Sequence, residues 1–154
     1  MMLAMTTFEQ EHKNKELLLA VIEGKPNLVR ALLASGADPG CRDGDGVSPL
    51  HLAALVLDYE CSEILLEGGA DVNARGQLGS TALHIVVGNP DMIHEHLVKL
   101  LRDHGADPHI RNDLGLSALD LADEATAGFL KPERPGIPER LRAMLRKRPP
   151  VPGL

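Results

Sequence analysis

The sequence predicts an all-α fold, a solenoid of stacked helix–turn–helix pairs, on two observations. The tripeptide Gly-Ala-Asp occurs at residues 36–38, 69–71 and 105–107, at intervals of 33 and 36 residues. A second series of glycines, Gly46, Gly79 and Gly115, repeats at the same two intervals. Because chance seldom produces two series with the same unequal spacing, the 154-residue chain is interpreted as one array of repeated units.

Each unit carries the signals of two short helices. Ser48, Thr81 and Ser117 precede the first apolar segments and can cap them, because a hydroxyl accepts a hydrogen bond from a free backbone N–H. A second apolar segment follows, with Leu, Ile or Val at three- and four-residue spacing. One such pair cannot bury its own apolar face, so neighbouring pairs must stack. The other structural residues are a proline in a first helical turn and the glycines that end the second helices: Pro49, Gly36, Gly69 and Gly105.

The segments that begin at these capping residues carry a family signature. They read Ser-Pro-Leu-His-Leu-Ala at 48–53, Thr-Ala-Leu-His at 81–84 and Ser-Ala-Leu-Asp-Leu-Ala at 117–122. They closely resemble the Thr-Pro-Leu-His-x-Ala signature of the ankyrin repeat. The resemblance implies an ankyrin-type solenoid with β-turn fingers, in four units at about residues 14–42, 43–75, 76–111 and 112–148. We expect residues 1–13 to extend the first helix and residues 149–154 to form a disordered tail.

The resemblance also implies roles for individual polar residues. In the family, the imidazole at the positions of His51 and His84 hydrogen-bonds and locks neighbouring turns together. Asn73 is the family's ordinary finger residue and is expected to hydrogen-bond its own loop. His94 and His96 are two positions apart, about 200° around a helix, so they cannot chelate one ion. We therefore expect no metal and no cofactor.

The third and fourth units are longer than the first two. Three extra residues lie near 88–91, and ten lie between about 125 and 138, where three prolines favour a long loop. A last amphipathic helix is expected to follow this insertion. Because it and the polar outer side of the first helix would cap both ends of the array, we expect a monomer. The residues concerned are Leu141, Met144 and Leu145 (inward), Arg140, Arg142, Arg146 and Lys147 (outward), and Glu9, Glu11, Lys13 and Glu16 on the first helix.

Composition and charge narrow the function classes. Aromatic residues are only 2%, which argues against platforms that stack nucleic-acid bases. Residues 1–130 carry 9 basic and 20 acidic side chains, whereas residues 131–154 carry 7 basic and 2 acidic ones. The sequence has no apolar segment long enough to span a membrane, and Cys41 and Cys61 cannot form a disulfide framework. We expect a cytoplasmic protein in a reducing compartment, with no membrane partner and with nucleic acid as an unfavoured one.

No motif in the sequence indicates catalysis. The chain lacks the Gly-x-Ser-x-Gly nucleophile motif and any Cys–His pair with supporting spacing. Cys41 falls in a finger and Cys61 in a helix, and we expect both to be unreactive thiols. The sequence therefore predicts a protein that is not an enzyme and has no catalytic residues.

The resemblance implies that a protein partner contacts the concave face, which the fingers and the first helices line. Arg42, Arg75 and Arg111 repeat at the edge of the fingers and could bind carboxylates, although each could instead pair with a neighbouring finger. Apolar residues also fall at positions that the family normally exposes, and packing between adjacent fingers is the alternative for them. We expect Val47, Leu78 and Leu114 to repeat at the finger turn together with Leu116, and Leu55, Val56 and Val87 to lie near the exposed end of the first helices.

These observations together predict a non-enzymatic protein–protein interaction module. It would bind its partner through the concave face and act as an adaptor, an inhibitor or an effector. A host-directed effector or enzyme-associated protein that uses the 125–138 insertion is one alternative. Binding of RNA or an acidic partner by the basic C-terminal helix is another.

Overall fold

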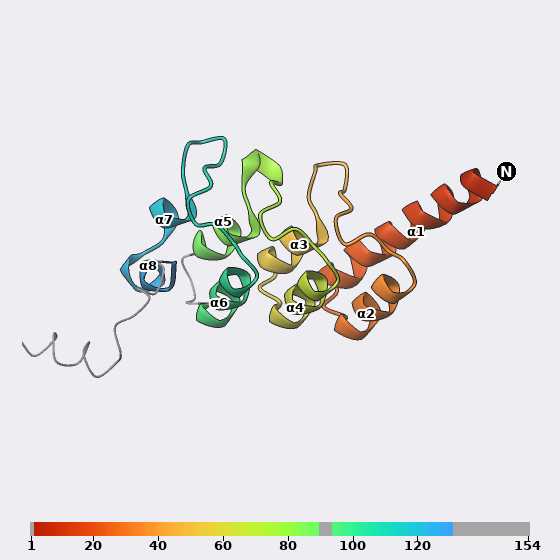
Figure 1. Ribbon diagram of the computed structural model, residues 1–154, viewed down its shortest axis with the longest axis horizontal. Coiled ribbons are helices and arrows are strands. Elements are labelled where there is room, and N and C mark those ends of the chain that lie inside the picture. Colours follow the sequence, from red (N-terminus) through yellow and green to blue (C-terminus); the bar gives the residue numbers. More distant parts are fainter. Residues whose placement is uncertain (1, 90–93, 131–154) are drawn as a thin grey trace, which may run out of the picture.

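The computed structural model describes residues 2–89 and 94–130, and the regular structure in these ranges is helical (Figure 1). The predicted solenoid of helix pairs is confirmed. An isolated antiparallel bridge joins Arg111 and Ser117. The elements are α1 (Met2–Ile22), α2 (Pro26–Ala34), α3 (Pro49–Leu55), α4 (Tyr59–Glu67), the single-turn 3-10 helix η1 (Gln77–Gly79), α5 (Ala82–Val87), α6 (Glu95–Asp103), α7 (Ala118–Leu121) and α8 (Glu124–Leu130).

The helices form two layers. The first helices α1, α3, α5 and α7 contact one another in sequence, and the second helices α2, α4, α6 and α8 do the same. The first helices lie between the second helices and three extended fingers that project from the array (Figure 1). The fingers and one side of the first helices therefore belong to the same surface.

The core is built from the side chains between the layers. Leu17, Leu65 and Leu101 are fully buried, and they belong to two neighbouring clusters of buried apolar residues. Burial of one such side chain stabilises the fold by about 1.5–3 kcal/mol. Because each cluster draws on more than one helix pair, the units stabilise one another rather than fold alone.

The helix ends follow the predicted chemistry. The side chains of Ser48, Thr81 and Ser117 accept hydrogen bonds from the backbone N–H three residues later, and α3 starts at Pro49. Asp58 caps α4 in the same way, accepting from the N–H of Cys61 at 3.0 Å. Glycines follow the second helices with φ angles of 101°, 98° and 92°, a region that a side chain disfavours: Gly36, Gly69 and Gly105.

The fourth unit differs from the prediction. The expected loop from about 125 begins as helix α8, which contacts α6 and buries Leu130 completely. Asp123 starts this helix by accepting a 2.8 Å hydrogen bond from the N–H of Thr126. The second-helix position of the fourth unit is thus filled by α8. The remainder of the insertion, the expected last helix and the expected tail lie outside the described residues.

Asn73 also departs from its expected role. Its amide nitrogen donates to the carbonyl of Gly105 at 3.1 Å, and its oxygen accepts from the N–H of Asp107 at 2.8 Å. The side chain therefore bonds the turn of the next unit rather than its own loop. This contact ties a finger of one unit to the second-helix end of the following one.

Candidate functional site

Two buried histidines on the first helices contact the backbone of the following fingers. The Nδ1 atom of His51 lies 2.6 Å from the hydroxyl of Ser48, and its Nε2 atom lies 3.0 Å from the carbonyl oxygens of Ala74 and Ser80 in the next finger. His84 repeats this arrangement one unit later, with Nε2 at 2.9 Å from the carbonyl of Leu116. Both rings are fully used in contacts with the protein, which positions each finger relative to the preceding first helix.

The surroundings of His51 keep its ring neutral. Burial lowers the pKa of His51 below its ordinary value of 6.5, against the opposing effect of the two backbone carbonyls. A Cβ atom on Gly76 would lie 2.8 Å from the Nε2 atom of His51, so only glycine leaves room for the ring there. The histidine and the glycine therefore fit each other as a pair.

The three arginines lie on the fingers but are not equivalent. The guanidinium of Arg42 donates to the carbonyls of Gly46 and Arg75, which links the first finger to the second. That of Arg111 donates to the carbonyl of Gly115 at 2.7 Å and lies 3.4 Å from a carboxylate oxygen of Asp120. These two arginines stabilise fingers. Among the described residues, the side chain of Arg75 has no such partner, and it is exposed.

The apolar residues of the fingers fall into two classes. Leu78 and Leu114 are 60% and 68% exposed and immediately precede the left-handed glycines of their fingers. Val47 and Leu116 instead each accept a hydrogen bond that closes their finger. The expected single series of Val47, Leu78 and Leu114 is therefore wrong, because Asp45 is the residue of the first finger that precedes its left-handed glycine. Leu116 is exposed, whereas Val47 is half-buried.

Leu78 has an unusual backbone. Its φ and ψ are 54° and 27°, the left-handed region that costs an ordinary side chain about 1–2 kcal/mol. In this conformation its carbonyl accepts a 2.9 Å hydrogen bond from the N–H of Asp113 in the next finger. In the first and third fingers, Asp43 and Asn112 close the turn with a side-chain oxygen, but Gly76 cannot do so. The second finger thus forms a different turn, with an exposed leucine at its tip.

One predicted contact residue on the first helices is buried. Leu55 is 64% exposed and Val56 is also exposed, whereas Val87 is only 8% exposed and packs in the core. The reason is helical geometry, because Val87 lies four residues after the buried Leu83 and so shares its face. The expectation that Val87 lines the partner surface is therefore wrong.

The structure adds an apolar series that the sequence analysis missed. In each first helix, the residue two positions after the leading leucine lies about 200° around the helix from it. In α3, α5 and α7 this residue also packs against the edge of the buried clusters. These residues are exposed in α1 and half-buried in α3, α5 and α7, whose neighbouring helices contact each other. Alignment of the leading leucines in the sequence would have found the series. We call it the first-helix ladder: Leu19, Leu52, Ile85 and Leu121.

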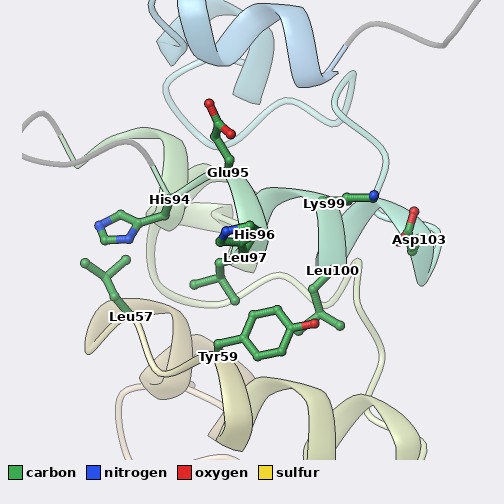
Figure 2. Close-up of a pocket in the computed structure, with 9 residues that line it drawn as sticks. All are labelled: Leu57, Tyr59, His94, Glu95, His96, Leu97, Lys99, Leu100 and Asp103. Atoms are coloured by element: carbon green, nitrogen blue, oxygen red, sulfur yellow. The ribbon is translucent and has the colours of Figure 1, made fainter.

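A groove of about 780 Å³ lies elsewhere, between α4 and α6. In Figure 2 Tyr59 and Leu100 lie together in one part of the groove and Leu57 points towards His94 in another, while Glu95 points away from them. The groove belongs to the second-helix layer, so it is separate from the fingers and the first-helix ladder. The other lining residues are His94, His96, Leu97, Lys99 and Asp103.

The described residues offer little reactive chemistry. Burial raises the pKa of the Cys41 thiol to about 11 and that of the Cys61 thiol to about 12, so both are protonated at neutral pH. Within residues 2–89 and 94–130, no three His, Cys, Asp or Glu side chains are arranged to hold a metal ion. No helix in the same ranges is long and apolar enough to cross a membrane.

Comparison with known proteins decides the family. The model for ankyrin repeats, in three copies, matches residues 17–112. The chain belongs to the ankyrin repeat family. Ankyrin repeats are generally non-enzymatic protein–protein interaction modules. This ankyrin repeat chain has exposed apolar residues on its fingers and first helices.

The relatives of this ankyrin repeat chain are longer proteins. An ankyrin repeat-containing protein of Treponema pallidum is 42% identical over 103 residues, which is 66% of this chain and 34% of the relative. One of Schizosaccharomyces pombe is 31% identical over 105 residues, covering 68% of this chain and 48% of the relative. The E3 ubiquitin-protein ligase KEG of Arabidopsis thaliana is 30% identical over 121 residues, 77% of this chain but 7% of the ligase. The chain thus spans less than half of each.

Proposed function

We propose that this chain is a non-enzymatic ankyrin repeat module that binds a protein partner through its concave face, the surface formed by the finger tips and the exposed side of the first helices. The observation that carries the proposal is the exposed pair Leu55 and Val56, which lies beside the half-buried residues of the first-helix ladder. Adjacent exposed apolar residues mark an interaction site, whereas isolated ones do not.

The mechanism of binding is preorganisation. The buried histidine contacts, the Asn73 bridge and the hydrogen bonds from Arg42 hold the fingers at set positions relative to the first helices. The conformational entropy of this surface is therefore lost on folding and not on binding. This lowers the free-energy cost of binding a partner and favours affinity. Apolar residues at the centre of such a surface carry most of the binding energy.

The charged rim of this face contains Arg75. Of the three finger arginines, it is the one whose exposed side chain contacts no finger among the described residues. A rim charge mainly raises the association rate and makes it salt-dependent. A partner with carboxylates beside its apolar contact residues fits this rim, because arginine binds carboxylates in a bidentate manner.

The two alternative functions receive less support. An effector or enzyme-associated site in the 125–138 insertion would need a free loop, but residues 124–130 form helix α8, which packs against α6. Binding of RNA or an acidic partner by the basic C-terminal segment concerns residues outside the described ranges. We place the module in the cytoplasm, since Cys41 and Cys61 are both buried free thiols that suit a reducing compartment.

The test is a comparison of three baits in a pull-down from the source cell. The wild-type chain is compared with Leu55→Asp, which places a charge beside the first-helix ladder, and with Tyr59→Asp as a matched control. Tyr59 is also an exposed apolar residue, but it lies on α4 in the second-helix layer. Thermal unfolding of all three baits checks that the fold is intact.

A protein captured by the wild type and by Tyr59→Asp but lost with Leu55→Asp supports the proposal. Loss with Tyr59→Asp alone would assign binding to the groove between α4 and α6. Equal capture by all three baits would contradict binding through the first helices. Loss of bound RNA at high salt, with no protein retained, would favour the nucleic-acid alternative.

A further inference from the structure

Helix α1 is much longer than the other first helices. It has 21 residues, or about 31 Å, whereas α3, α5 and α7 have seven, six and four. Its C-terminal half packs in the array, and its N-terminal half extends past α2 away from it (Figure 1). One side of α1 is attached to the array, because Lys13 donates to the carbonyl of Ser35 at 2.8 Å.

The opposite side of α1 carries an exposed apolar seam. Phe8, Leu19 and Ile22 are 72%, 57% and 53% exposed. With His12 and Lys15, which are also exposed, they occupy positions separated by four, three, four and three residues. This is the spacing at which the contact residues of a coiled coil repeat. The seam is therefore suited to packing against another helix.

The part of the seam from Phe8 to Leu19 is symmetric about its own centre, with Ile22 lying beyond it. Reading from either end gives an apolar residue, two polar residues and an apolar residue, at Phe8, His12, Lys15 and Leu19. A second copy that runs antiparallel matches this pattern with itself. Phe8 then lies opposite Leu19 of the partner subunit, and His12 lies opposite Lys15 of the partner subunit. We propose that two copies of this chain associate through an antiparallel pair of α1 helices.

The charges near the centre of the seam fit this register. Glu16 lies 3.2 Å from the imidazole of His12, and Glu11 directly precedes His12 in the sequence. An antiparallel copy brings Lys15 of the partner subunit next to these carboxylates. Polar residues at the middle of a helix pair specify its register and direction, because any shift leaves them against apolar neighbours.

The proposal replaces the expectation of a monomer. That expectation rested on polar outer residues, but Lys13 points to the array and Phe8 points to solvent. The N-terminal half of α1 projects from the array, and short isolated helices are marginally stable in water. A second copy would cover the seam and stabilise this part of the helix. Leu19 belongs both to this seam and to the first-helix ladder, whereas Phe8 lies outside the concave face, so a substitution at Phe8 tests the inference separately from the proposed partner binding.

The first test is the mass of the full chain in solution. Sedimentation equilibrium from about 1 to about 500 μM spans the affinities expected of a small helix pair. The wild type should pass from monomer to dimer, and Phe8→Glu should weaken the dimer at least about tenfold. Leu114→Glu is the matched control, because Leu114 is exposed to a similar extent but lies on a finger. A wild type that remains monomeric, or a dimer that Phe8→Glu leaves unchanged, would overturn the proposal.

A second test examines the direction of the pair. Phe8→Cys and Leu19→Cys chains are treated with a short bis-maleimide, alone and as a mixture, while the native cysteines are buried. The antiparallel register predicts cross-linked dimers in the mixture and not with either variant alone. Efficient cross-linking of Phe8→Cys alone would show a parallel pair and refute the proposed register. Loss of binding in the pull-down with an intact dimer would affect the proposed function alone.

Discussion

The backbone N–H of Asp107 donates a 2.8 Å hydrogen bond to the side chain of Asn73, 34 residues earlier in the chain. The amide of Asn73 also reaches the carbonyl of Gly105. One side chain thus satisfies two backbone groups of the turn that follows α6. The bridge fixes the spacing between a finger and the following unit.

Two residues of helix α1 make an equivalent bridge to the turn that follows α2. Gln10 donates to the carbonyl of Gly36 at 2.9 Å, and Asn14 accepts from the N–H of Asp38 at 2.9 Å. Two residues of a helix therefore make the two hydrogen bonds that Asn73 makes in the third unit. The corresponding turn of the second unit has no such bridge among the described residues, because Gly40 stands at the position of Asn73.

We predict that Gly40→Asn stabilises the array by about 1 kcal/mol, the typical gain from a new hydrogen bond. The local turn is suited to the change. The N–H of Gly40 bonds the carboxylate of Asp38 at 2.8 Å, just as that of Asn73 bonds Asp71 at 3.0 Å. The φ angle of Gly40 is not in the left-handed region. Urea unfolding measures the free energy.

Gly40→Ala is the control for this prediction. It restricts the unfolded chain in a similar way but cannot bridge to the next turn. If the bridge stabilises the array, Gly40→Asn should be more stable than Gly40→Ala, and Asn73→Ala should be less stable than the wild type. Equal stability of the two Gly40 variants would mean that the bridge contributes nothing at this turn.

The second prediction separates stability from binding at Leu78. Asparagine tolerates the left-handed conformation better than leucine, so Leu78→Asn should raise the free energy of unfolding by about 0.5–1 kcal/mol. The same change removes an exposed apolar side chain from the proposed partner surface and should weaken binding. Leu114→Asn, at a position without positive φ, should weaken binding with no gain in stability. If both variants change stability equally, the backbone of Leu78 is not strained.

The third prediction concerns pH. The folded pKa of His51 is lowered from 6.5, so the unfolded chain binds this proton more readily. The contribution of His51 to the free energy of unfolding is therefore fully present above pH 6.5. It falls as the pH drops below this value, by at most about 1.4 kcal/mol per pH unit. Unfolding free energies between about pH 7.5 and about pH 5.5 should show this slope for the wild type and a shallower one for His51→Gln. Identical slopes would show that His51 titrates normally in the fold.

The fourth prediction concerns the thiols. Because burial raises the pKa values of Cys41 and Cys61 to about 11 and about 12, neither forms a thiolate at neutral pH. Labelling by a coloured disulfide reagent should be slow in the native state and fast in denaturant. Rapid labelling of one cysteine without denaturant would reveal a local opening that the packing around it does not indicate.

The sequence predicts the helix pairs well for a physical reason. Gly36, Gly69 and Gly105 end helices in a conformation that only glycine adopts readily, so their spacing reports the repeat directly. Helix α8 was missed because the prolines further along favoured a loop, while its start depends on one capping side chain, Asp123. Comparing the lengths of the repeat units reveals extra residues, but it does not reveal a capping side chain that starts a helix within them.

The candidate surface was predictable only in part. Leu55 and Leu114 could be placed from their positions in the unit, and Val87 could have been excluded by its spacing from Leu83. The backbone of Leu78 could not be predicted, because it follows from the missing side chain at Gly76, which in turn makes room for His51. Contacts between units decide such positions, and no single unit contains them.

The central claim is that the concave face binds the partner, and the most direct measurement is the dissociation constant of the purified partner by titration calorimetry. Leu55→Asp and Leu114→Asp should each raise it more than tenfold, about 1.4 kcal/mol, with the melting temperature nearly unchanged. Tyr59→Asp, on the second-helix layer, should leave it unchanged. Normal binding by both leucine variants together with weakened binding by Tyr59→Asp would contradict the account and assign the partner to the groove between α4 and α6.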